Sequence, residues 1–197
     1  MATWRGNQKG MTLLEAIISV AILGMTAIIG VGTLERAYEQ AAARAVAGTF
    51  RSLVAEATLR SVTERLYVGI VFSEEEKGVA ARLYADGDGD GIQSEDIRRG
   101  TDIPLSRQVI LKADRARLGI PPAVSRDPEG NPLPPDDPVR FGRASILSFG
   151  PTATATPGSL YIQGNSGREV WAFRVAGLGG RVRVFRWFRG KWEAVGG

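Results

Sequence analysis

Apolar side chains near the start of the chain form one long run. Across residues 11–34 the only charged residue is Glu15, and the ten residues before the run carry Arg5 and Lys9 without an acid. At a rise of about 1.5 Å per residue, about 24 residues form a helix of roughly 36 Å, longer than a hydrocarbon core of about 30 Å. The pattern predicts a transmembrane helix over residues 11–34, with the basic flank on the cytoplasmic side.

Apolar residues continue at helical spacing over residues 35–66. Positions three or four apart lie on one face of a helix, and the apolar positions with this spacing are Val46, Phe50, Leu53, Val54, Ala57, Val62 and Leu66. Charged residues of both signs fall on the opposite face, which we expect to be solvated. The pattern predicts an amphipathic stalk helix whose apolar stripe faces a sheet.

From residue 67 the pattern changes to short β-type runs separated by turn residues. Residues 66–72 and 79–84 flank a polar turn at 73–78, which predicts a hairpin. Further strands are expected at 108–111, 145–149, 159–163, 169–175 and 181–188. The sequence therefore predicts an α+β fold, in which a long N-terminal membrane-spanning α-helix packs on a small antiparallel β-sheet head formed by residues 67–197.

Residues 119–138 interrupt the strand pattern. Seven of the ten prolines lie in this segment, together with Asp127, Glu129, Asp136 and Asp137. Proline and acidic residues favour turns and extended, solvated backbone. We expect this Pro-rich loop to be exposed and open to disorder.

Composition narrows the range of functions. The 197 residues contain no cysteine and no histidine, so the chain has no disulfide, no thiolate metal site and no imidazole for acid–base catalysis near neutral pH. A carboxylate or a Ser/Lys pair could still act as a catalytic site, but no such constellation stands out. We expect a non-enzymatic protein with one globular head.

Glu15 is a carboxylate inside the predicted membrane span, where an ionised acid is costly unless a cation pairs with it. The segment 9–24, which begins Lys-Gly-Met-Thr-Leu-Leu-Glu, resembles the type III signal of type IV pilins and type II secretion pseudopilins. The resemblance implies cleavage by prepilin peptidase after Gly10 and N-methylation of Met11. It also implies that Glu15 pairs with the terminal amine of its own or a neighbouring subunit. The alternative is a plain signal anchor in which Glu15 reaches the membrane interface.

The same resemblance implies a place in the cell. Residues 1–10 would be a cleaved leader, and the mature chain would cross the inner membrane once, with its N-terminus cytoplasmic and its C-terminal head periplasmic. Subunits of this class are extracted into a periplasmic or surface filament. The implied partners are other pilin or pseudopilin subunits, prepilin peptidase and the inner membrane.

Short motifs in the head carry a narrower resemblance. Residues 146–150, 156–162 and 180–183 follow the pilin helix and the hairpin in an order that resembles the GspH/FimT family. That family contains the minor pseudopilin H of type II secretion and a fimbrial minor pilin of natural transformation systems. It implies a minor pseudopilin that primes or caps a type II secretion or type IV pilus filament. The alternative function is a DNA-binding minor pilin for DNA uptake.

Aspartate alternates with glycine over residues 86–91, as at the opening of an EF-hand-type calcium loop. The candidate Ca²⁺ ligands are Asp86, Asp88, Asp90, Ser94 and Asp96. Position twelve of the loop is Ile97 instead of a bidentate acid, so Glu95, Asp96 or Asp102 would have to close the cage. Asp-Gly pairs also form solvated turns without a metal. Calcium is therefore a candidate cofactor beside that simpler interpretation.

Positive charge is concentrated after residue 168, although the whole chain carries only +4. On a strand, Arg181, Arg183, Phe185 and Trp187 share one face, and arginines beside aromatic rings suit nucleic acid. Residues 180–183 also resemble the DNA-binding motif of the transformation-linked members. The candidate nucleic-acid-binding residues are Arg181, Arg183 and Arg186. The alternative is that they are ordinary turn and strand residues, with the two aromatic rings in the core.

Overall fold

The computed structural model describes residues 12–75, 78–112, 116–164, 167 and 169–195, except for the side chains at 26–36, 39, 43, 78, 112 and 116. The chain divides into two compact units, residues 1–38 and residues 39–197. The helix α1 (Leu13–Glu64) has residues in both units.

In the first unit, α1 presents apolar side chains to its surroundings. The exposed large apolar residues here are Leu13, Leu14, Ile17, Ile18, Val20, Ile22, Leu23 and Met25. Among the described residues, no helix is long and apolar enough to cross a membrane. Met11 and the side chains at 26–34, which belong to the predicted transmembrane helix, lie outside the described residues. The transmembrane helix over residues 11–34 therefore stays a prediction.

In the second unit, the rest of α1 buries an apolar stripe. Val46, Phe50, Leu53, Val54 and Ala57 are buried in the main core, which confirms the helical spacing expected for them. The expectation is wrong for Val62, which is 42% exposed and lines an open groove with Leu59 and Gly180. The helix stops at Arg65, whose backbone has a left-handed φ of 56°.

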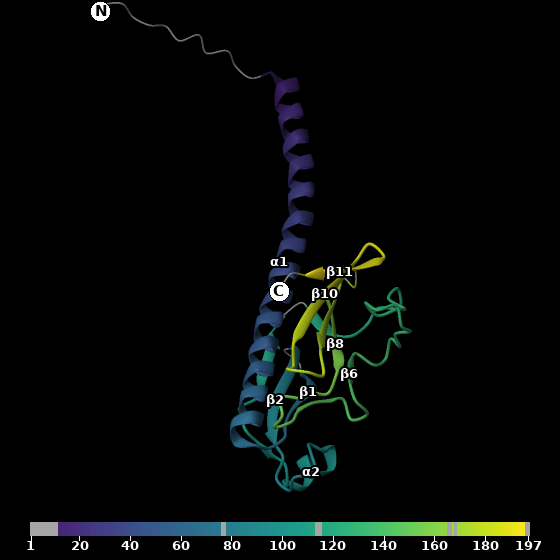
Figure 1. Cartoon of the computed structure of the whole chain (residues 1–197). Coiled ribbons are helices and arrows are strands. Elements are labelled where there is room, and N and C mark those ends of the chain that lie inside the picture. Colours follow the sequence, from purple (N-terminus) through teal and green to yellow (C-terminus); the bar gives the residue numbers. More distant parts are fainter. Residues whose placement is uncertain (1–11, 76–77, 113–115, 165–166, 168, 196–197) are drawn as a thin grey trace, which may run out of the picture. The chain divides into compact units, whose positions relative to one another are not determined.

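The first sheet lies beside this part of α1 (Figure 1). Its strands are β1 (Val68–Glu75), β2 (Gly78–Ala85), β3 (Ile103–Pro104), β4 (Val109–Lys112) and β7 (Ile146–Phe149). The predicted hairpin is confirmed as the antiparallel β1–β2 pair, which runs from Val68 opposite Ala85 to Glu75 opposite Gly78. β7 pairs with the other edge of β1, while β3 and β4 both pair with β2.

The second sheet contains the C-terminal strands. Its members are β5 (Ala116–Leu118), β6 (Val139–Phe141), β8 (Gly158–Gly164), β9 (Val170–Val175), β10 (Val182–Phe188) and β11 (Lys191–Val195). The order is β11-β10-β9-β8-β5, with β6 also on β8, and all of these pairs are antiparallel. The structure is thus α+β with antiparallel sheets, consistent with a pilin-like head.

Two apolar cores hold this unit together. The main core lies between α1 and the two sheets and contains the rings of Phe50, Phe141, Phe149 and Phe173. A smaller core lies against the second sheet and is built from Ile120, Val124, Leu133, Tyr161, Val170 and Ala172, with Phe185, Trp187 and Trp192 packed on it. Side chains alternate between the two cores along β8 and β9: Leu160, Ile162, Trp171 and Phe173 belong to the main core, and Tyr161, Val170 and Ala172 to the smaller one.

The smaller core corrects the expectation for the Pro-rich loop at 119–138. Its apolar residues Ile120, Val124 and Leu133 are buried, and its turns are closed by hydrogen bonds such as Leu133 N to Ser125 O at 2.9 Å. The loop is therefore anchored on the sheet through these three residues, which cover aromatic rings that would otherwise meet water, while most of its other residues are exposed, as predicted.

Candidate functional site

The N-terminal signal enters the described residues at the start of α1. The Thr12 hydroxyl accepts a hydrogen bond from the Glu15 N–H at 3.3 Å, so Thr12 caps the helix and Glu15 is the third residue of the first turn. The Glu15 side chain is exposed, and no cation among the described residues pairs with it. The cleavage pair Gly10 and Met11 lies outside the described residues.

The helix cap at Thr12 is a feature that the sequence analysis did not predict. A Thr followed three residues later by Glu is the sequence signature of a helix start, and it would have placed the first turn at residues 12–15. A carboxylate in the first turn is also favoured by the helix dipole. The Glu15 carboxylate thus lies in the first turn of the helix.

The acidic loop folds around carboxylates that accept backbone N–H groups. Asp86 Oδ1 accepts from Gly89 N at 2.8 Å, and its Oδ2 accepts from Gly91 N at 2.9 Å. Asp102, which is buried, accepts from Gly87 N at 3.3 Å and from Gln93 N at 3.0 Å. These bonds hold the loop in a compact turn by themselves.

The structure brings most of the predicted calcium ligands together. The carboxylates of Asp86, Asp88 and Asp102 lie within 4.8 Å of one another, as do those of Asp88, Asp90 and Asp96. Oxygen ligands so close to one another fit the hard cation Ca²⁺. Partial removal from water, together with the charges of Asp90 and Asp86, raises the pKa of Asp88.

The remaining acidic and hydroxyl candidates belong to α2 (Ser94–Arg99), a short helix that the sequence pattern did not reveal. Ser94 is exposed at its first position, whereas Asp96 is buried. Glu95 pairs with Arg98 and, at 3.1 Å, with Arg99. Of the three acids considered for closing the cage, Asp96 and Asp102 lie in the acidic clusters, and Glu95 is engaged elsewhere.

The basic candidates divide between the two faces of β10. Arg181 and Arg183 are exposed. Arg186 lies on the opposite face with Val184, its guanidinium 5.1 Å from the centre of the Phe188 ring and 3.4 Å from Glu193 Oε2. Arg186 therefore does not join Arg181 and Arg183, because side chains alternate along a strand and 186 differs in parity from 181 and 183.

The aromatic residues of this strand are packed and not free. Phe185 and Trp187 contact the smaller core, and the rings of Trp187 and Trp192 lie 5.5 Å apart edge to face. Trp192 also donates a hydrogen bond from Nε1 to the Arg126 carbonyl at 2.8 Å. These rings fasten the Pro-rich loop to the sheet, and this favours the alternative interpretation in which they belong to the core.

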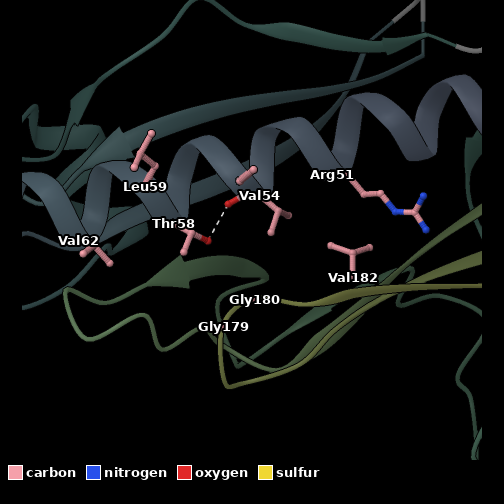
Figure 2. Close-up of a pocket in the computed structure, with 9 residues that line it drawn as sticks. Arg51, Val54, Thr58, Leu59, Val62, Gly179, Gly180 and Val182 are labelled. Carbon is pink, nitrogen blue, oxygen red and sulfur yellow. Dashed lines mark hydrogen bonds between the residues drawn. The ribbon is translucent and has the colours of Figure 1, made fainter. Parts of the chain in front are cut away.

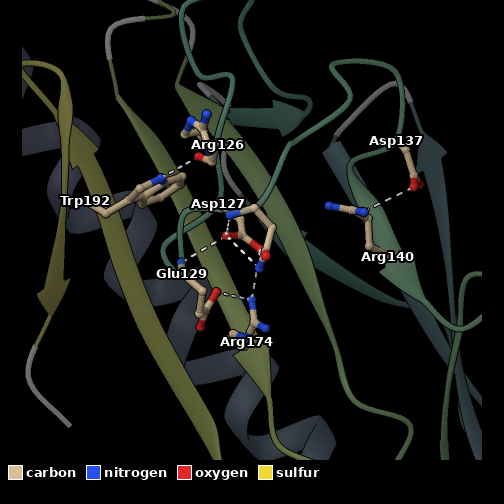
Figure 3. A network of polar contacts seen from close by, with 8 residues as sticks. Arg126, Asp127, Glu129, Asp137, Arg140, Arg174 and Trp192 are labelled. Carbon is tan, nitrogen blue, oxygen red and sulfur yellow. Dashed lines mark hydrogen bonds and ion pairs between the residues drawn. The ribbon is translucent and has the colours of Figure 1, made fainter.

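A polar network joins the Pro-rich loop to β9 (Figure 3). Arg174 Nη1 lies 3.5 Å from Asp127 Oδ2 and forms a shorter ion pair with Glu129. Asp127 also accepts from the N–H groups of Glu129 at 3.0 Å and Asn131 at 2.8 Å. Burial would raise the pKa of Asp127, but these hydrogen bonds and the Arg174 charge outweigh it, so the pKa is lowered.

A groove of 540 Å³ runs between α1 and the turn before β10 (Figure 2). It is lined mainly by apolar atoms of Val54, Leu59, Val62 and Val182, with Gly180 at its floor. Gly180 has a left-handed φ of 58°, and a Cβ there would lie 2.9 Å from Phe149 Cε1 and 3.2 Å from Thr58 Oγ1. A glycine is therefore required at Gly180, the first residue of the 180–183 motif, because the turn contacts the helix there.

The comparison with protein families bears on the N-terminal signal. Residues 5–31 match the prokaryotic N-terminal methylation motif. The match covers part of the predicted leader, Glu15 and the first turns of α1, and it supports a type IV pilin-like or pseudopilin class processed by prepilin peptidase. This class is structural and assembles from pilin subunits. No curated protein and no solved structure matches the chain.

Proposed function

We propose that the protein is a minor pseudopilin of the GspH/FimT type, which primes or caps a type II secretion or type IV pilus filament. The observation that carries the proposal is the methylation motif over residues 5–31, with Glu15 exposed in the capped first turn of α1. An exposed carboxylate at a helix start is available to the methylated amine of its own or a neighbouring subunit. The antiparallel head is consistent with this assignment.

Processing provides the first test. In cells that contain prepilin peptidase, we expect the mature chain to begin at Met11 and to carry one methyl group on its amine, as measured by intact-mass and N-terminal peptide analysis. Gly10→Val blocks cleavage, whereas Gly6→Val, a matched change inside the leader, leaves it unaffected. A wild-type chain that keeps Met1 in peptidase-positive cells contradicts the proposal.

Assembly tests the role of Glu15. We expect Glu15→Val to be processed normally but to be lost from sheared filament fractions, since the apolar side chain offers no partner for an amine. Glu15→Asp retains the charge and should restore part of the incorporation. Incorporation of Glu15→Val at the wild-type level would contradict the role of Glu15 in assembly.

The proposal places residues 11–34 in the inner membrane, with the head in the periplasm. It is supported by the apolar run in the sequence and by the exposed apolar side chains of α1 between Leu13 and Met25. We expect the unprocessed chain to resist extraction by alkaline carbonate. Protease added to spheroplasts should degrade the head, and protection of the head would contradict this topology.

DNA binding is the second candidate function. Arg181 and Arg183 favour it, because both are exposed and neither forms an ion pair within the described part of the chain. The packed rings of Phe185 and Trp187 leave only phosphate contacts for this surface. The test is a gel shift of the full-length chain in detergent with duplex DNA. Arg181→Gln/Arg183→Gln should abolish salt-sensitive binding, whereas Arg98→Gln/Arg99→Gln, the same charge change on α2, should not.

The acidic loop remains a predicted calcium site. Its support is the alternating spacing and the two clusters of carboxylates around Asp88. The hydrogen bonds of Asp86 and Asp102 to backbone N–H groups serve a metal-free turn equally well. Calorimetric titration with Ca²⁺ separates the two interpretations, because only a metal site gives heat that Asp86→Ala abolishes.

A further inference from the structure

Three arginines surround a concave pocket of 730 Å³ at the outer side of the second sheet. Arg174 on β9 and Arg183 on β10 are directly opposite in the antiparallel register, and Arg181 immediately precedes β10. Glu129 of the Pro-rich loop reaches the same pocket, and Pro157, Val175 and Leu178 provide apolar walls. The pocket therefore combines an excess of positive charge with apolar surface.

The charges in this pocket are unevenly balanced. Arg174 is paired with both Asp127 and Glu129, whereas Arg181 and Arg183 have no ion-pair partner among the described residues. Like charges directly opposite each other on neighbouring strands are unfavourable. An anion beside Arg183 and Arg181 would offset the repulsion between Arg183 and Arg174.

The two carboxylates that hold Arg174 differ in how easily they can be replaced. The Asp127 side chain is 7% exposed and is fixed by hydrogen bonds from the Pro-rich loop. The Glu129 side chain is 41% exposed, and within the described part of the chain its carboxylate pairs with Arg174 alone. Glu129 can therefore leave the pocket while Asp127 keeps Arg174 in position.

We propose that this pocket receives an acidic side chain from a neighbouring filament subunit, on a segment that also presents an apolar side chain, and that Glu129 is the internal competitor for this position. The inference rests on the proposed function, since that function supplies the neighbouring subunits. It extends the basic surface of Arg181 and Arg183 to Arg174, makes Glu129 a competitor for that surface, and specifies the chemistry of the partner.

Three observations favour a polypeptide over nucleic acid as the ligand. Arg174 already binds carboxylates in this pocket, and Leu178, which is 82% exposed, offers an apolar contact that a phosphate backbone does not use. The rings that would stack on bases, Phe185 and Trp187, are packed against the smaller core. An acidic segment with an apolar neighbour uses both kinds of surface.

The test uses the full-length chain in detergent and a fluorescein-labelled peptide of alternating leucine and glutamate, with binding followed by fluorescence anisotropy. Its counterpart with glutamine in place of glutamate is the control ligand. The variants are Arg181→Gln/Arg183→Gln, its charge-matched control Arg98→Gln/Arg99→Gln, and Glu129→Gln. Sodium phosphate and duplex DNA are added as competitors, and circular dichroism confirms that each variant is folded.

We expect the glutamate peptide to bind more tightly than the glutamine peptide, and high salt to reduce this preference. Arg181→Gln/Arg183→Gln should weaken binding by roughly tenfold, the expected loss of two solvent-exposed ion pairs. Glu129→Gln should tighten it by about threefold, because the internal competitor is removed. The control variant should bind as the wild type does.

Several outcomes would overturn the proposal. Equal binding of the two peptides would show that no carboxylate is recognised, and unchanged or weaker binding by Glu129→Gln would show that Glu129 does not compete. Displacement by duplex DNA at lower concentration than by unlabelled peptide would assign the surface to nucleic acid, and equal displacement by phosphate would assign it to free anions. The mass of the mature N-terminus, measured on the same preparations, tests the proposed function separately.

Discussion

The contact between Gly180 and α1 leads to a prediction with a built-in control. Gly179 and Gly180 are adjacent and both have a left-handed φ, 68° and 58°. Alanine at either position carries a similar backbone cost of about 1 kcal/mol. A Cβ at Gly179 meets nothing within 4 Å, whereas a Cβ at Gly180 overlaps Phe149.

The additional cost at Gly180 follows from the packing around it. The Phe149 ring is buried in the main core and cannot move away without displacing its neighbours. A Cβ on Gly180 would also lie 3.4 Å from Val54 Cγ1, on the helix. Forcing extra atoms into such a site costs about 1–3 kcal/mol. We therefore expect Gly180→Ala to lose about 1–3 kcal/mol more than Gly179→Ala.

The assay is thermal unfolding of the full-length variants in one detergent, followed by tryptophan fluorescence. A difference of 2 kcal/mol corresponds to a midpoint about 4–8 °C lower for Gly180→Ala than for Gly179→Ala in a chain of this length. Midpoints that agree within about 1 °C would refute the close packing of the turn on α1.

Three further predictions address the core, the polar network and the acidic loop. Phe50→Ala removes a fully buried ring and should lower the free energy of unfolding by about 3–5 kcal/mol, measured by thermal unfolding. Leu59→Ala changes a side chain that is 64% exposed and should lower it by less than about 0.5 kcal/mol. Equal losses would contradict the assigned helix face. Because the pKa of Asp127 is lowered from its ordinary value of 3.8, its charge stabilises the fold above that pH and the stabilisation is lost as pH falls below it. Thermal melts between about pH 5 and pH 3 should therefore show a smaller acid-dependent loss for Asp127→Asn than for the wild type, and an equal loss would contradict the role of this carboxylate. If the acidic loop binds calcium with a Kd of about 1 mM, then about 10 mM calcium should stabilise the wild type by about 1.4 kcal/mol and leave Asp86→Ala unchanged; equal midpoints with and without calcium would leave the loop a metal-free turn.

Hydrophobic periodicity was enough to predict much of the head. The stripe from Val46 to Ala57 is buried as expected, and the strands expected from residue 108 onward correspond to β4, β7, β8, β9 and β10. These elements have regular alternation or helical spacing, and burial of one face follows directly from it. Arg183 and Arg186 are three positions apart, so their spacing already indicates opposite faces of a strand. The prediction that both belong to one nucleic-acid-binding surface overlooked this.

Other features depend on contacts that no local pattern encodes. The Pro-rich loop packs through three apolar residues at irregular spacing, Ile120, Val124 and Leu133, so it has no periodicity to detect. The network between Asp127, Glu129 and Arg174 joins residues 45 positions or more apart in the chain. The helix α2 has only six residues, and β11 is short and partly polar, so each gives too weak a signal for assignment from sequence alone.

The clustering of aromatic rings on the second sheet has a spectroscopic consequence. Of the four tryptophans, Trp4 lies in the predicted leader, while Trp171, Trp187 and Trp192 all belong to the strands of this sheet. If the predicted leader is removed, the tryptophan fluorescence of the mature chain comes entirely from the second sheet. Because Trp187 and Trp192 contact the smaller core and Trp171 the main core, undocking of the Pro-rich loop would alter the emission of two fluorophores before the third, without any added label.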